Sequence, residues 1–189
     1  MRGAGNAVYP KGYREFESRP LRQLGESIIL IMLKVKPFRQ QKSGFCGPAS
    51  LKMVLDYYGV KKSEKELAEL SGCAISKGAK AEGLLQAAKK LGFKGFIKDF
   101  SDIEDLRKYV LKKKIPVIVD WFSTDEGHYS PVVDINQENI YLQDPELRGI
   151  RAMKIKTFRR VWFDFSGDFL HSKDEIIIRR MIVIDKKKK

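Results

Sequence analysis

The sequence has few of the residues that build metal centres or covalent scaffolds. It contains only two cysteines and two histidines in 189 residues. A four-ligand zinc site would use all four of them or would need added carboxylates. A single possible disulfide cannot hold together a chain of this length. The counts exclude a disulfide-stapled scaffold, and we expect the fold to rest on a hydrophobic core instead.

Long apolar runs are also missing. The longest run, residues 28–33, has six residues, whereas a membrane-spanning helix needs about 20. We interpret this run as a buried strand, because no small-residue cleavage site of a signal peptide follows it. The chain shows no long internal repeat. We therefore expect a cytoplasmic protein without a transmembrane segment, in which Cys46 and Cys73 stay reduced.

Positive charge is abundant but unevenly placed. The chain has 37 Lys and Arg against 24 Asp and Glu, a formal charge of +13. Residues 1–36 hold seven basic and three acidic residues, which is +4, and residues 186–189 are four lysines. This leaves +5 for residues 37–185, an ordinary value for a domain. The excess therefore lies mainly in the ends and does not indicate nucleic acid as a partner.

The composition suggests one domain with two appendages. Residues 1–26 are rich in Gly, Arg and Pro and lack an apolar period, which is typical of a poorly ordered leader. Residues 27–185 have the regular patterning of a folded domain, and residues 186–189 form a lysine tail. We predict a single domain over 27–185.

The first half of this domain has helical patterning. Apolar residues at i, i+3, i+4 and i+7 mark one face of a helix that begins at Cys46, with Gly59 as its stop. Capping boxes open two further helices, one with Ser63 and Glu66, the other with Ser101 and Glu104. The predicted helices are residues 46–58, 63–72, 81–91 and 101–115.

The second half has extended patterning. Short β-branched runs alternate with turns, and one short helix interrupts them. Helices that precede strands favour an α+β fold with N-terminal helices packed on a C-terminal antiparallel sheet. The predicted strands are residues 116–122, 128–135, 140–143 and 175–184, and the helix is 157–163.

Cys46 stands where a loop meets the start of a predicted helix. Free N–H groups and the helix dipole favour an anion there, which suits a nucleophilic thiolate. The flanking Gly44 and Gly47 leave room for a substrate backbone to approach the sulfur. The same position also suits a small buried apolar residue, so the location alone leaves catalysis open.

His128 follows Gly127 at the start of a predicted strand and is suited to accept a thiol proton. A purely structural histidine is the alternative. The other histidine, His171, lies in a polar loop and has no comparable setting. A hairpin centred on residues 136–139 returns Asp144 toward His128, where a carboxylate can fix the imidazole tautomer. An Asp-Pro pair is, however, most often only a turn.

A glutamine six residues before Cys46 completes the set. The side-chain amide of Gln40 can donate to a developing oxyanion together with the backbone N–H of Cys46. Gln41 competes for this role, because a bulge in the loop would exchange the two residues. We favour Gln40.

These motifs resemble a known family. Residues 40–51 read Gln-Gln-Lys-Ser-Gly-Phe-Cys-Gly-Pro-Ala-Ser-Leu and run into a helix that ends in Asp-Tyr-Tyr-Gly. This segment, the strand at 114–119, His128-Tyr129, the Asp144-Pro145 turn and the helix at 157–162 are similar to the C-thirty-nine papain-like cysteine peptidases. That family comprises the bacteriocin-leader-processing peptidases and their free-standing relatives. The likeness spans residues 36–184.

The resemblance implies a papain-like fold and a cysteine peptidase or amidohydrolase acting on peptide or protein substrates. It implies Cys46 as nucleophile, His128 as base, Asp144 as orienting carboxylate and Gln40 as oxyanion donor. Such chemistry requires no metal or organic cofactor. Acyl transfer to an amine on the same fold, or a non-catalytic basic binding module with a vestigial triad, are the alternatives.

The sequence departs from the family in two respects. Pro131 interrupts a strand that is usually continuous, so we expect that strand to be bulged or at an edge. Well-studied relatives are fused to an ABC transporter, but this sequence has no Gly-x-x-x-x-Gly-Lys-Ser/Thr phosphate loop. Neither ATP binding nor a double-glycine leader as substrate follows from the sequence.

Overall fold

The computed structural model describes residues 32–124, 126–165, 167 and 169–186. Six strands form an antiparallel sheet in the order β1-β8-β2-β3-β4-β5, and a second sheet pairs β6 with β7. The predicted leader and most of the strand predicted at 28–33 lie outside the described residues. Leu33, at the end of that run, donates its N–H to the carbonyl of Val133, with an N–O distance of 2.9 Å.

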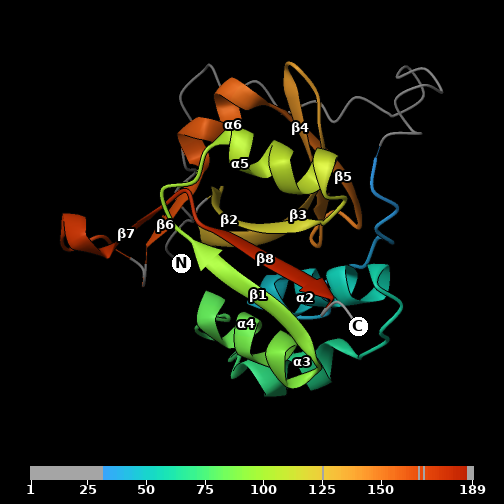
Figure 1. The fold of residues 1–189 in the computed structure, drawn as a ribbon. Helices are drawn as coiled ribbons and strands as arrows, with labels where there is room; N and C mark the ends of the chain where they lie inside the picture. The colour runs from blue at the N-terminus through green and yellow to red at the C-terminus, as the bar shows by residue number, and fades with distance from the viewer. Residues whose placement is uncertain (1–31, 125, 166, 168, 187–189) are drawn as a thin grey trace, which may run out of the picture.

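The element order is α+β, as predicted (Figure 1). The strands are β1 (Phe93–Lys98), β2 (Val117–Ser123), β3 (Glu126–Ile135), β4 (Asn139–Asp144), β5 (Gly149–Lys154), β6 (Phe163–Phe165), β7 (Ile176–Ile178) and β8 (Met181–Lys186). The α-helices are α2 (Cys46–Tyr57), α3 (Glu64–Ser71), α4 (Ala81–Lys90), α5 (Ile103–Arg107) and α6 (Ile155–Val161). A π-helical turn, η2 (Lys108–Lys112), continues α5, and a 3-10 turn, η3 (Lys173–Glu175), precedes β7.

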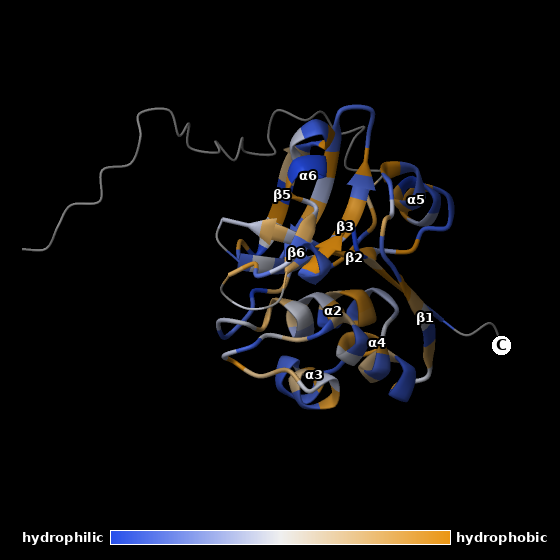
Figure 2. Ribbon diagram, turned by 90° about the vertical axis from the view of Figure 1, so that its left-hand side faces the viewer, coloured by the Kyte–Doolittle hydropathy of each residue, from blue (hydrophilic) through white to orange (hydrophobic). Residues whose placement is uncertain are grey.

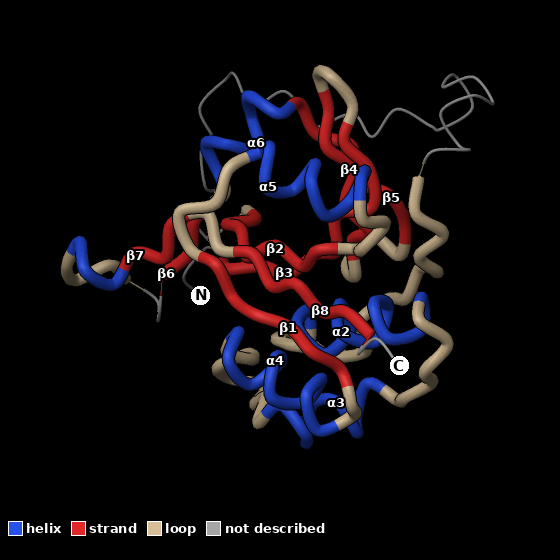
Figure 3. Tube along the Cα trace, in the orientation of Figure 1, coloured by secondary structure: helices blue, strands red, loops and turns tan. Residues whose placement is uncertain are grey.

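The main sheet separates two hydrophobic cores. Helices α2, α3 and α4 cover one face, while α5 and α6 lie on the other (Figures 1 and 3). Alternate residues of β2 serve the two faces: Ile118 packs with the α2 side, whereas Val117 and Val119 pack with the opposite core. Figure 2 shows the apolar strands β2 and β3 between these layers. The thiol-bearing helix is therefore held directly against the sheet.

Local signals set most helix ends. Ser63 and Glu66 form the predicted capping box, and Gly72 ends α3 in the left-handed conformation. The second predicted box is wrong by one residue, because Asp102 and Asp105 cap α5. The hydroxyl of Ser101 donates to the Lys98 carbonyl instead, so it is not available for the helix.

The strand predictions need correction in two respects. Strands β1, β5 and β6 were not predicted. The strand predicted at 175–184 is two strands, β7 and β8, because Arg179 between them has a φ of 50°. Strand β7 pairs with β6, whereas β8 enters the main sheet between the edge strand β1 and β2. A turn at one residue therefore moves the chain from the small sheet to the large one.

Pro131 lies in β3, which is an inner strand of the sheet. Its pairing with β4 begins only at Val132 and shifts register before Asp134, so the predicted bulge is present. On the other side, Pro131 is opposite Ile118 of β2. The proline thus stands just outside the β4 ladder, where its missing N–H costs no hydrogen bond to that strand.

Within the described residues, no helix is long and apolar enough to cross a membrane.

Candidate active site

Cys46 is the first residue of α2 and is 8% exposed. The preceding loop turns at Gly44, which has a φ of 74°, and a Cβ there would lie 2.6 Å from the Ile75 carbonyl oxygen. A Cβ on Gly47 would lie 3.0 Å from the Ala79 Cβ. Both glycines therefore allow neighbouring protein segments to approach, and this differs from our expectation that they admit a substrate. Their role is to seat the start of α2.

A hydrogen bond joins helix α2, which begins with Cys46, to strand β3, which carries His128. The hydroxyl of Ser50, one turn beyond Cys46, donates to the Tyr129 carbonyl at 2.8 Å. Tyr129 follows His128, which is 1% exposed. At Gly127 the carboxylate of Asp164 occupies the space that a Cβ would fill, so a larger residue immediately before His128 would force the Asp164 side chain to move. Strand β6 thus packs on the start of β3.

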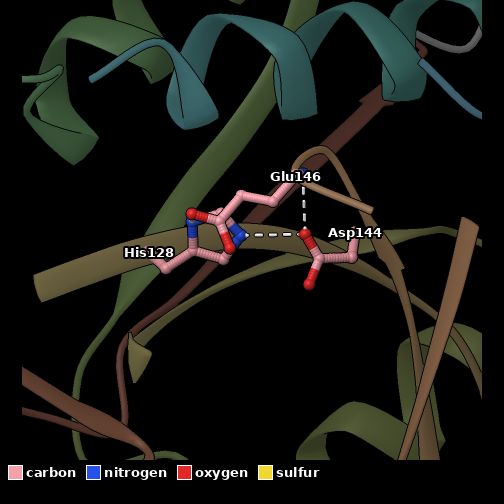
Figure 4. Close-up of side chains that lie close together, drawn as sticks. All are labelled: His128, Asp144 and Glu146. Carbon is pink, nitrogen blue, oxygen red and sulfur yellow. Dashed lines mark hydrogen bonds and ion pairs between the residues drawn. The ribbon is translucent and has the colours of Figure 1, made fainter. Parts of the chain in front are cut away.

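His128 and Asp144 meet across the sheet. The imidazole Nε2 lies 3.1 Å from Oδ1 of Asp144, the last residue of β4 (Figure 4). The same Oδ1 accepts the backbone N–H of Glu146 at 2.8 Å, and Oδ2 accepts the Nε–H of Arg151. Asp144 is completely buried. Because Nε2 is engaged, Nδ1 is the nitrogen available for proton transfer.

The electrostatics of this cluster favour the charged forms of His128 and Asp144. Burial lowers the pKa of His128, but hydrogen bonds with Asp144 and Cys46 and the charges of both residues outweigh burial and raise it to about 10. Burial raises the pKa of Asp144, yet His128 and Arg151 outweigh it and lower that pKa to about 2. An imidazolium next to an ionised carboxylate is therefore favoured at neutral pH.

The structure brings Cys46, His128 and Asp144 together and places the glutamine loop beside them. The Gln40 N–H donates to the carbonyl of Pro145, the residue after Asp144, at 2.9 Å. Its side-chain nitrogen donates to the Lys42 carbonyl at 3.1 Å, and its Oε1 is buried without a partner. The Gln41 N–H instead binds the buried carboxylate of Glu64, at 3.1 and 3.3 Å from its two oxygens.

The sequence analysis did not identify Arg151, Glu146 or Trp121 as residues of the site. The Trp121 ring packs edge-on against the His128 ring, with centroids 5.5 Å apart. The Arg151 guanidinium lies over the same indole, 5.6 Å from its centroid. Arg151 could have been found only by predicting β5, because the β4–β5 register makes it a diagonal neighbour of Asp144.

A metal ion fits this cluster poorly. His128, Asp144 and Glu146 each offer one ligand atom, and the three atoms lie within 4.8 Å of one another. Both oxygens of Asp144 are, however, already bound by an imidazole, a backbone N–H and the guanidinium of Arg151. A cation would have to displace Arg151, which already compensates the carboxylate.

Helices α2–α4 against an antiparallel sheet, with a helix-start thiol beside an imidazole and a carboxylate, define the papain-like class of fold. The model of the Peptidase C39 family matches residues 34–166. The chain belongs to this family.

Similar chains extend from archaea to bacterial transporters. A protein of unassigned function from Methanothermobacter thermautotrophicus is 34% identical over 148 residues, which cover 78% of this chain and 89% of that protein. The lactococcin-G-processing and transport ATP-binding protein LagD of Lactococcus lactis is 30% identical over 124 residues, which are 65% of this chain and 17% of LagD.

Two solved structures share the fold. The peptidase domain of Streptococcus ComA, a bifunctional ABC transporter, has a TM-score of 0.64 at 24% identity, covering 81% of this chain and 99% of that domain. A C39-like peptidase from Bacillus anthracis has a TM-score of 0.64 at 20% identity, covering 84% and 98% of the two chains.

Proposed function

We propose that this protein is a cysteine peptidase that cleaves peptide bonds, with Cys46 as nucleophile and His128 as base. The observation that carries the proposal is the geometry of buried His128, whose Nε2 lies 3.1 Å from Oδ1 of Asp144. Burial lowers the pKa of His128, but hydrogen bonds and charge from Asp144 and Cys46 outweigh it and raise that pKa to about 10. A buried imidazolium held between a carboxylate and a thiol is the arrangement that thiolate catalysis requires. Family membership supports the same activity.

In this mechanism the Cys46 thiolate attacks the carbonyl carbon of the scissile amide, and the carbonyl oxygen becomes an oxyanion. Nδ1 of His128 then gives its proton to the leaving amine as the C–N bond breaks, which leaves an acyl-enzyme. Neutral His128 next removes a proton from water, and the resulting hydroxide displaces the thiolate from the acyl group. Asp144 fixes the ring through Nε2 during both transfers.

Peptides are the substrate class that the relatives favour. A double-glycine-motif protease from an AMS/PCAT transporter, 21% identical with a TM-score of 0.65, has been solved in complex with the leader peptide. LagD is described as lactococcin-G-processing. A mixture of random peptides, with double-glycine leader peptides included, is therefore the first substrate to test.

Thiol labelling tests the proposed nucleophile without knowledge of the substrate. Iodoacetamide at pH 6 should alkylate Cys46 at least about 100-fold faster than Cys73, because the adjacent His128 imidazolium favours the nucleophilic form of the thiol. Cys73 is an internal control, since burial and the nearby charges of Cys46 and Glu64 raise its pKa to about 11. Mass spectrometry of tryptic peptides measures both rates. Equal labelling of the two thiols would contradict the proposal.

We further propose that Gln40, rather than Gln41, donates to the oxyanion. The backbone of Gln40 is tied to Pro145 beside the triad, whereas Gln41 is exposed. Gln40→Ala should lower kcat for peptide hydrolysis by about 100- to 1,000-fold, the usual loss for one oxyanion donor. Gln41→Ala is the matched control, and its kcat should fall by much less. A larger loss in Gln41→Ala would reverse the assignment.

A further inference from the structure

Glu146 lies over the reactive face of the proposed catalytic histidine. Its Oε1 is 4.0 Å from Nδ1 of His128, and its Oε2 is 3.8 Å from a terminal nitrogen of Arg151. Figure 4 shows its carboxylate reaching over the imidazole ring. Both separations are longer than a direct hydrogen bond. The Glu146 side chain is 38% exposed, so a ligand can reach it.

The position of Glu146 is set by the residue that orients the ring. Its backbone N–H donates to Oδ1 of Asp144 at 2.8 Å, and that same oxygen accepts from Nε2 of His128. The turn that follows β4 is thereby fixed against the triad, and the Glu146 side chain starts from a defined point. From that point its carboxylate oxygen Oε1 reaches to 4.0 Å from Nδ1, the nitrogen that must hand a proton to the leaving amine.

The charges of the side chains around Nδ1 of His128 do not cancel. A Cys46 thiolate and a His128 imidazolium form a neutral pair, and Arg151 is the direct partner of Asp144. Glu146 makes only long contacts, to Nδ1 of His128 and to Arg151, so these five side chains together carry one net negative charge. That charge lies in a chain whose formal charge is +13. It is therefore opposite in sign to the formal charge of +5 that residues 37–185 carry.

We propose that Glu146 is a specificity-determining residue that selects ligands with a positive charge on the leaving-group side of the scissile bond. This rests on the proposed cysteine peptidase function. A cationic group bound there, such as a lysine or arginine side chain or a free α-amine, meets the Glu146 carboxylate. An acidic group at the same place faces repulsion. The substrate class is thus a peptide with a basic residue just after the cleaved bond.

Charged alkylating reagents test this without a known substrate. Rates at Cys46 are measured with neutral iodoacetamide, anionic iodoacetate and cationic 2-bromoethylammonium, in which the thiolate displaces the halide. In Glu146→Gln the iodoacetate to iodoacetamide ratio should rise about three- to ten-fold over wild type, and the bromoethylammonium to iodoacetamide ratio should fall similarly. These factors correspond to one unit charge at about 6 Å in a partly solvated site.

Glu138→Gln is the matched control, because it removes one carboxylate from the exposed turn between β3 and β4. Its two ratios should match those of wild type. The inference is overturned if Glu146→Gln leaves both ratios unchanged, or if all three reagents change by one common factor, which would place the effect on the thiolate. Slow labelling of Cys46 by every reagent in the wild-type protein would instead remove the proposed function, and this inference with it.

Discussion

Replacing His128 with alanine should reduce peptide hydrolysis by about 1,000-fold or more. It should also slow alkylation of Cys46 at pH 6 by about 100-fold, because an unassisted thiol is less than about 1% ionised at that pH. In the wild-type protein the thiolate–imidazolium pair should keep alkylation fast from acidic pH upward. The pair is lost as His128 deprotonates near its pKa of about 10. The measurement is the pH profile of Cys46 alkylation, followed by mass spectrometry.

The other histidine provides the control for this prediction. His171 is exposed and lies far along the chain in the turn before β7, where its N–H binds the Glu175 carboxylate. His171→Ala should therefore keep the wild-type profile. His128→Ala should lose the fast alkylation at acidic pH, because no imidazolium then assists the thiol. If the pH profiles of Cys46 alkylation in His128→Ala and wild type coincide, the assignment of His128 as the base is wrong.

Replacing Asp144 with alanine should cost both activity and stability. The change frees the His128 ring and removes the buried partner of Arg151. Loss of one partner of a buried ion pair costs about 3 to 5 kcal/mol; because Arg151 is 24% exposed, we expect about 2 to 3 kcal/mol. Hydrolysis should fall by about 100-fold or more, since the imidazole tautomer is no longer fixed. Urea unfolding and peptide turnover are the two measurements.

The pH dependence of stability should show the contribution of the Asp144 charge. The pKa of Asp144 is lowered from 3.8 to about 2 in the folded state. Its ionised form therefore contributes stability that is complete above pH 4 and is lost as the pH falls through 2. Wild-type stability should decrease by about 2 kcal/mol more than that of Asp144→Ala over this window. Asp144→Asn, which keeps a hydrogen bond to the ring but no charge, should lose the same pH-dependent part. If the stability of wild type and of both variants changes with pH in the same way, the predicted contribution of the Asp144 charge is wrong.

The fold was predictable where local signals were strong. Helix α3 has a serine cap, a glutamate three residues on and a terminal glycine, and each of these acts within a few residues. The hairpin that returns β4 to β3 follows from turn residues at 136–139, and it correctly placed Asp144 near His128. Strands β1 and β5 were missed because an edge strand with alternating exposed residues has a weak apolar pattern.

The residues of the site also fall into two groups, those that local sequence signals indicate and those that only the pairing of distant segments brings to the site. Cys46 and His128 were visible because glycine and turn signals set their local positions, and family resemblance joined them. Arg151 and Glu146 were not visible. Arg151 reaches Asp144 through the register of β4 and β5, and Glu146 approaches His128 because the following turn binds Asp144. Both depend on pairing between distant segments, for which short-range patterns carry little information.

The sequence by itself determined the α+β class, the helix-start thiol and the concentration of positive charge at the chain ends. These properties depend on period, composition and caps, which act over neighbouring residues. Only the tertiary structure decided that Asp164 packs on Gly127, that Arg151 binds Asp144 and that Glu146 lies over the imidazole. Such contacts arise from strand register and close packing between segments far apart in the chain, so they appear only when the whole sheet is assembled.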